Sequence, residues 1–153
     1  MARDDVSDLY LETYGEFSRY GDQLGDSYEA SRRSDFTQAA EMAMLFVFGG
    51  IANGLLSWLG ERLGDGTRAQ VRRLQLLRSP GTSAERYEFA EDDVIEVIPF
   101  LSQGLKELSE DQIEQLVALL ATGLTERGFT ESTARTLAYG TVERIRKFGR
   151  DNA

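Results

Sequence analysis

The chain has 153 residues, of which 41% are hydrophobic and 28% charged, a balance typical of a single globular domain and too apolar for disorder. The absence of cysteine excludes disulfides and thiolate chemistry, and the absence of histidine removes the commonest general base and metal ligand. The net charge of −9 argues against nucleic-acid binding, which needs clustered positive charge.

Acidic and basic residues alternate in blocks along the chain. Residues 1–40 hold nine acids and four bases, 60–80 hold five arginines and two acids, 85–115 are again acidic, and 126–153 are weakly basic. Such blocks predict helices that pair with oppositely charged partners, within the chain or between copies. Only Lys106 and Lys147 among the 17 bases are lysines. Acidic excess with scarce lysine suits a protein kept soluble at high salt, so a halophilic source is one hypothesis.

The first segment, about 5–24, predicts an amphipathic helix with an aromatic face. Its aromatic residues Tyr10, Tyr14 and Phe17 recur at helical spacing. One interpretation is that they are simply interior. The other is that part of this face stays exposed and forms an interface, since contiguous exposed apolar surface usually marks one. We adopt the second and predict a homo-oligomer, most simply a dimer.

The strongest feature is an uncharged apolar run from Met42 to Leu59, inside a predicted helix over about 38–60. Eighteen such residues are near the minimum that spans a bilayer. Gly50 and Gly54 have the spacing of close-packed membrane helices, Trp58 lies where interfacial aromatics belong, and the following arginines predict a cytoplasmic C-terminal side. The same run suits the centre of a soluble bundle, which Asn53 and several glycines favour. Gly49 and Gly50 could also split it into two helices.

A basic helix is predicted from Arg68 to about Leu77, capped by Thr67. Arg68 and Arg72 lie on its outward side, and we predict that they meet the acidic first helix of a second copy across a two-fold axis. The loop at 79–87 marks a possible subdivision of the single domain.

The C-terminal half predicts three further helices. Pro99 lies inside the first pattern, where it either kinks the helix or starts a new one, and residues 94–98 could instead form a short strand. Ser109 and Gln112 form a capping box, Gly128 ends that helix, and Thr130 caps the last one.

Two weaker site hypotheses come from this half. Residues 128–137 have the order of a helix-turn-helix corner, so a DNA-binding regulator using residues 110–146, with Arg135 and Arg144 on the nucleic acid, is a minor alternative. Glu88, Glu91, Asp92 and Asp93 could hold a hard cation, but their spacing matches no calcium loop, and a solvated helix start explains them better.

The prediction is therefore an all-α bundle of five or six helices around the apolar helix at about 38–60. No nucleophile, phosphate-binding loop or metal-ligand pattern is present, so we expect no enzyme, no catalytic residues, no cofactor and no metal. The expected function is that of a non-enzymatic scaffold, adaptor or regulatory subunit that binds a protein partner or itself. The N-terminus has no usual signal peptide, which predicts a cytoplasmic location. The alternative is a plasma-membrane protein anchored by residues 42–59.

Overall fold

The computed structural model describes residues 3–21, 33–75 and 83–151, with side chains for 5–21, 40–73 and 94–148. These ranges contain six α-helices and no strand, which confirms the predicted all-α class. In chain order they are α1 (Arg3–Arg19), α3 (Arg33–Leu59), α4 (Asp65–Gln75), α5 (Ser83–Lys106), α6 (Glu110–Glu126) and α7 (Glu131–Asp151), with a short 3-10 helix η1 (Gly60–Arg62) after α3.

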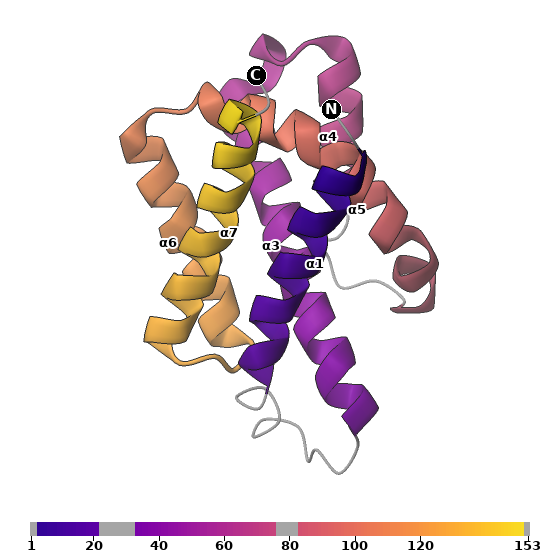
Figure 1. Ribbon diagram of the computed structural model, residues 1–153. Helices are drawn as coiled ribbons and strands as arrows, with labels where there is room; N and C mark the ends of the chain where they lie inside the picture. Colours follow the sequence, from indigo (N-terminus) through magenta and orange to yellow (C-terminus); the bar gives the residue numbers. More distant parts are fainter. Residues whose placement is uncertain (1–2, 22–32, 76–82, 152–153) are drawn as a thin grey trace.

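Helix α3 is the centre of the bundle and contacts each of the other five α-helices (Figure 1). Val47, Phe48, Ile51, Ala52 and Leu55 have no exposed side-chain surface, because α1, α4, α5, α6 and α7 surround them. A helix enclosed on most sides must be apolar nearly all round, which explains its lack of charge. The segment Ala40–Arg62 is also long and apolar enough to cross a membrane, and 61% of its most apolar stretch is buried in the bundle.

Local signals in the sequence fix several helix ends. The Ser109 hydroxyl accepts from the Gln112 backbone N–H at 3.2 Å, and the Gln112 side chain accepts from the Ser109 N–H at 2.9 Å, which confirms the capping box. Thr130 accepts from the Thr133 N–H at 3.3 Å and starts α7. Gly60 (φ 46°) and Gly128 (φ 121°) adopt backbone angles that L side chains rarely take, and they end α3 and α6.

Other boundaries differ from the sequence-based expectation. Helix α3 runs without interruption through Gly49 and Gly50, and α5 continues through Pro99, so residues 94–98 are helix rather than strand. Proline removes one backbone hydrogen bond, but Val97, Ile98 and Leu101 around it are fully buried, and their packing outweighs that loss. Residues 83–87, predicted as loop, belong to α5, while 79–82 lie outside the described residues.

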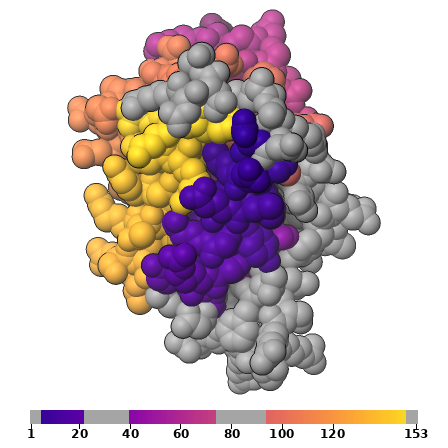
Figure 2. Space-filling view, viewed as in Figure 1, coloured from indigo at the N-terminus to yellow at the C-terminus, as the bar shows by residue number. Residues whose placement is uncertain are grey.

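The C-terminal helices form an antiparallel pair. Helices α6 and α7 run side by side in opposite directions, and α7 also packs on α5 and α1 (Figure 1). In the space-filling view α1 and α7 lie against each other across one face of the molecule (Figure 2). Helix α6 also packs on α3, and along this contact Phe46, Gly50 and Asn53 of α3 remain partly exposed.

Candidate functional site

Three glycines set the close approach of α3 to α6. A Cβ atom on Gly50 would lie 2.4 Å from Leu120 Cδ2, one on Gly54 would lie 3.0 Å from Leu116 Cδ1, and one on Gly123 would lie 2.2 Å from the Phe46 ring. Contacts below 3.0 Å are essentially never seen for real Cβ atoms, so a larger residue at Gly50 or Gly123 would displace the end of the Leu120 or Phe46 side chain. At Gly54 the Leu116 side chain would have to move by a few tenths of an ångström. The Gly50–Gly54 spacing noted in the sequence is used here between two helices of one chain.

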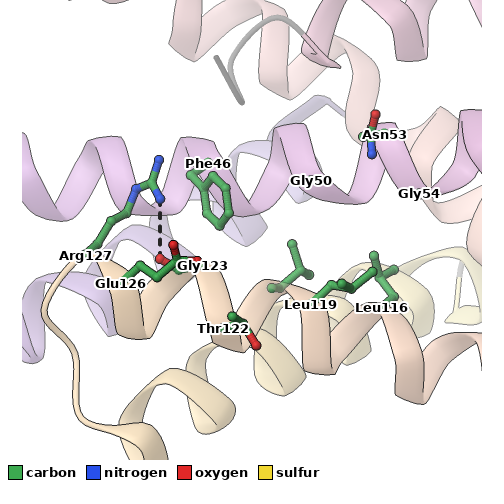
Figure 3. Close-up of a pocket in the computed structure, with 11 residues that line it drawn as sticks. Phe46, Gly50, Asn53, Gly54, Leu116, Leu119, Thr122, Gly123, Glu126 and Arg127 are labelled. Carbon is green, nitrogen blue, oxygen red and sulfur yellow. Dashed lines mark hydrogen bonds between the residues drawn. The ribbon is translucent and has the colours of Figure 1, made fainter. Parts of the chain in front are cut away.

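The same approach leaves a pocket of about 320 Å³ between the two helices (Figure 3). Gly50, Asn53 and Gly54 line it from α3, and Leu116 and Leu119 line it from α6. Gly50 and Gly54 add no side chain to its wall, and Leu120 and Leu116 of α6 lie directly against them. Leu119 stands at the rim with 64% of its surface exposed. A small apolar cavity next to an exposed leucine is a shape that suits a side chain arriving from outside.

One end of the pocket is closed by a cation–π contact. The Arg127 guanidinium lies over the Phe46 ring, 3.9 Å from the centroid, and its Nη1 donates to the Gly123 carbonyl at 3.3 Å (Figure 3). Such a contact contributes about 0.5–1 kcal/mol at an exposed site. It fixes Phe46 over Gly123 and holds the charge of Arg127 at the end of the pocket rather than along it.

Charged side chains reach this pocket only at one end, where Glu126 and Arg127 line it. Helix α3 is uncharged from Met42 to Gly60, and α6 is uncharged from Gln115 to Thr125. We call the solvent-facing part of these two stretches the α3/α6 face; its exposed or half-buried members are Met42, Phe46, Gly50, Asn53 and Ser57 of α3 and Gln115, Leu119 and Thr122 of α6. In a chain with 28% charged residues, an uncharged surface of this length stands out, because interface centres are depleted of charge.

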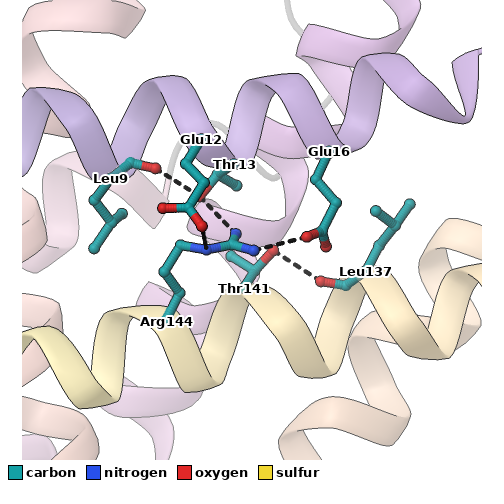
Figure 4. Close-up of polar contacts among 7 residues, drawn as sticks. All are labelled: Leu9, Glu12, Thr13, Glu16, Leu137, Thr141 and Arg144. Carbon is teal, nitrogen blue, oxygen red and sulfur yellow. Dashed lines mark hydrogen bonds and ion pairs between the residues drawn. The ribbon is translucent and has the colours of Figure 1, made fainter.

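A second polar cluster joins α1 to α7 (Figure 4). Arg144 donates to Glu16 Oε2 at 2.7 Å and to the Thr13 hydroxyl at 2.9 Å, and its Nε lies 3.6 Å from Glu12 Oε1. Thr13 in turn donates to the Leu9 carbonyl at 2.8 Å. Only 17% of the Arg144 side chain and 22% of Glu16 are exposed, so this is a largely desolvated ion pair between distant segments. These contacts of Arg144 with Glu12, Thr13 and Glu16 hold α7 against α1, and we call them the clamp.

The clamp predicts a stability effect that surface arginines do not share. Arg144→Met keeps the length of the side chain but leaves the Glu16 carboxylate half-buried without its cation, so we expect a loss of about 1.5–3 kcal/mol. Arg135→Met, an exposed position on the same helix, is the matched control and should change stability by less than about 0.5 kcal/mol. Urea denaturation of both variants measures this, and equal effects would contradict the clamp.

Two of the three aromatic residues predicted to form an interface on the first helix are buried. Tyr10 is 3% and Phe17 0% exposed, and they pack within the core on Phe48 and Phe129. Tyr14 is half-buried near α3; burial raises its pKa, and the nearby Glu41 carboxylate raises it further. These side chains therefore correspond to the interior alternative, because α3, α5 and α7 cover the stripe that α1 presents.

The predicted contact between the acidic first helix of one copy and the basic helix of another stays a prediction, and the structure shows the pairings that these helices make within one chain. The α1 acids Glu12 and Glu16 find their cation within the chain, on α7. On α4, Arg68 donates to Asp65 Oδ1 and to the Leu63 carbonyl at 3.4 Å, and Arg72 is exposed. Trp58 is half-buried beside Gly54, in protein rather than at a free helix end.

The minor site hypotheses gain little from the structure. Arg144, one of two arginines expected on DNA, is engaged by Glu12 and Glu16, and α6 and α7 form an antiparallel pair, whereas helix-turn-helix helices cross steeply. The side chains of Glu88, Glu91, Asp92 and Asp93 lie outside the described residues. Within the described side chains, no three acidic residues lie close enough to share a metal ion.

Comparisons with known proteins give no relative: no protein family, no curated protein and no solved structure matches the chain.

Sequence reasoning did not single out Leu119, Phe46 and Arg127. A signal for Leu119 was present, since Ile113, Leu116, Val117, Leu120 and Leu124 form one helical stripe that α6 buries, and Leu119 lies outside it. A leucine off the buried stripe is exposed in any packing that uses the stripe. For Phe46 and Arg127 the sequence carries no comparable signal, because they lie 81 residues apart and meet only through the α3–α6 packing.

Proposed function

We propose that this protein is a non-enzymatic interaction protein, a scaffold, adaptor or regulatory subunit, whose docking surface is the α3/α6 face. The observation that supports it is the coincidence of three features: an uncharged surface, a pocket of about 320 Å³, and the exposed Leu119 at its rim. Interfaces concentrate apolar anchors beside pockets and keep charge at their edges. The same surface suits an apolar anchor of a partner helix, the usual way in which an amphipathic helix occupies a groove between two others.

Photo-crosslinking from the α3/α6 face tests this proposal. A photoreactive amino acid replaces Leu119 in one variant and Leu11 in another; Leu11, on α1, is 60% exposed and serves as the matched control. Irradiation in the cells that naturally make the protein should give discrete crosslinked protein products from position 119 and none from position 11. Identification by mass spectrometry then states whether the product contains another protein or only this chain. Equal labelling from both positions, or none from either, would remove the α3/α6 face as a docking surface.

A second candidate function is membrane association through the same helix. The observation that favours it is the length and uncharged character of α3 between Met42 and Gly60. In this candidate α3 would have to leave its contacts with the other five α-helices, exposing side chains that are now fully buried. Carbonate extraction of cell membranes separates the two: an interaction protein is released, and an inserted helix is retained.

A further inference from the structure

We infer that the occupant of the α3/α6 face is a second copy of this chain, related by a two-fold axis that runs along the groove between α3 and α6. The inference rests on the proposed function and names the partner of that surface. It is offered in place of the dimer contact expected from the aromatic residues of α1, of which Tyr10 and Phe17 are interior.

Helices α3 and α6 pack in a defined register. The close pairs Gly50 with Leu120, Gly54 with Leu116, and Phe46 with Gly123 show that the two helices are antiparallel in a fixed register. At a rise of about 1.5 Å per residue, Leu119 therefore stands within about 3 Å of the height of Gly50 and Asn53 along the groove. The protruding Leu119 and the α3 wall of the pocket at Gly50 and Asn53 lie at one level, on opposite sides of the groove.

A two-fold axis along the groove uses this arrangement directly. A rotation of 180° about this axis keeps the position of each residue along the groove and exchanges the two sides of the groove. Helix α6 of each copy therefore lies over α3 of the other. Leu119 of one copy then stands over the mouth of its partner's pocket beside Gly50 and Asn53, and the reverse contact forms at the same time. An isologous interface needs a surface that is complementary to itself, and a protrusion and a hollow at equal height provide it.

The centre of the α3/α6 face carries no charge that would oppose a second copy. Two copies with net charge −9 repel each other, and along the uncharged stretches of α3 and α6 they can approach without placing acids opposite acids. At the end where α3 stops, the same axis brings Asp111 of one copy to within about 5 Å of the height of both Glu61 and Arg62 of the other. Arg62 lies 3.7 Å from Glu107 of its own chain, so charges of both signs meet at this rim and the uncharged centre is what the contact depends on.

The size of the face sets the expected strength. The uncharged stretch of α3 is about 27 Å long, and two adjacent helices are about 20 Å wide, which gives a footprint of roughly 500 Å² per copy. Stable interfaces bury about 800 Å² per partner, so this dimer belongs to the weak, reversible class. We therefore expect association in the range of tens of micromolar, strengthened by salt, because screening weakens the repulsion between two acidic copies.

Sedimentation equilibrium of the full chain between about 10 and about 300 μM tests the association. The wild type should dimerise, and more strongly at about 1 M than at about 0.1 M salt. Leu119→Lys should weaken the dimer about tenfold or more, since it places a charge over an apolar hollow. Leu11→Lys changes the net charge equally and should leave the dimer unchanged. Circular dichroism checks that both exposed substitutions keep the fold.

The axis itself is tested by cysteine crosslinking, which is clean because the chain has no cysteine. Asn53→Cys and Leu119→Cys are prepared separately, mixed, and treated with a short bis-maleimide. The proposed axis places position 119 of one copy close to position 53 of the other, so the mixture should give more crosslinked dimer than either variant alone. Crosslinking that is strongest for Leu119→Cys alone would overturn this axis.

The remaining outcomes also decide the inference. A wild type that stays monomeric up to about 300 μM at both salt concentrations overturns the dimer. If crosslinking from position 119 then yields a different protein, the proposed function stands and only the partner was wrong; if it yields nothing, both fall. The last outcome is a monomer that co-sediments with vesicles of phosphatidylcholine and phosphatidylglycerol. If Leu119→Lys abolishes this co-sedimentation and Leu11→Lys does not, the face is a lipid contact and the dimer is overturned as well.

Discussion

Replacement of Ala52 by aspartate is expected to unfold the protein at neutral pH. Ala52 has no exposed surface, and it lies on α3 between the equally buried Ile51 and Leu55. A carboxylate there has neither solvent nor a cation, and its burial costs several kcal/mol against a total stability of roughly 5–15 kcal/mol. Far-ultraviolet circular dichroism with urea titration measures the result, and we expect loss of the cooperative transition.

The matched control is Ser57→Asp on the same helix. Ser57 is exposed, so the same change in net charge should leave the monomer folded and its urea midpoint within the range of ordinary surface substitutions. Comparison of the two variants separates burial from helix propensity and overall charge. A soluble, cooperatively folded Ala52→Asp protein would show that α3 is not enclosed as the structure has it.

Truncation of Phe17 is the second large expected effect. Its ring has no exposed surface and meets the Phe129 ring edge to face, with 6.3 Å between centroids, so it links α1 to the turn before α7. Phe17→Ala removes this contact and leaves a cavity, which costs about 3–5 kcal/mol in protein cores. Differential scanning calorimetry should give a melting temperature lower by many degrees, with no change in oligomeric state at temperatures where the variant is folded.

This result separates the core from the interface interpretation of the aromatic helix. If Phe17 lay at a dimer interface, Phe17→Ala would lower the association constant and leave the monomer stable. Leu11→Ala, on the exposed side of the same helix, should change the melting temperature little. A variant that is monomeric and fully stable would restore the aromatic interface and remove Phe17 from the core.

The helical class and several helix ends were determined by the sequence alone. The capping box at Ser109, the cap at Thr130 and the stop at Gly128 involve residues within a few positions of one another, so their chemistry is visible without a fold. The central place of α3 also follows from its composition, since an uncharged helix of this length must be enclosed by something. The sequence left open whether protein or lipid surrounds this helix, because hydrophobicity does not distinguish a protein interior from lipid.

The tertiary structure decided which faces are covered. Tyr10 and Phe17 carry the same aromatic signal whether they are core or interface, and only the packing of α1 on α3, α5 and α7 places them inside. Pro99 signals a helix break, yet the burial of the residues around it keeps α5 continuous. The pocket depends on Phe46, Gly50 and Leu119, which are distant in sequence and meet because three glycines let α3 and α6 approach. Local propensity acts over a few residues, whereas exposure is a property of the whole packed chain, which is why the α3/α6 face was found only in the fold.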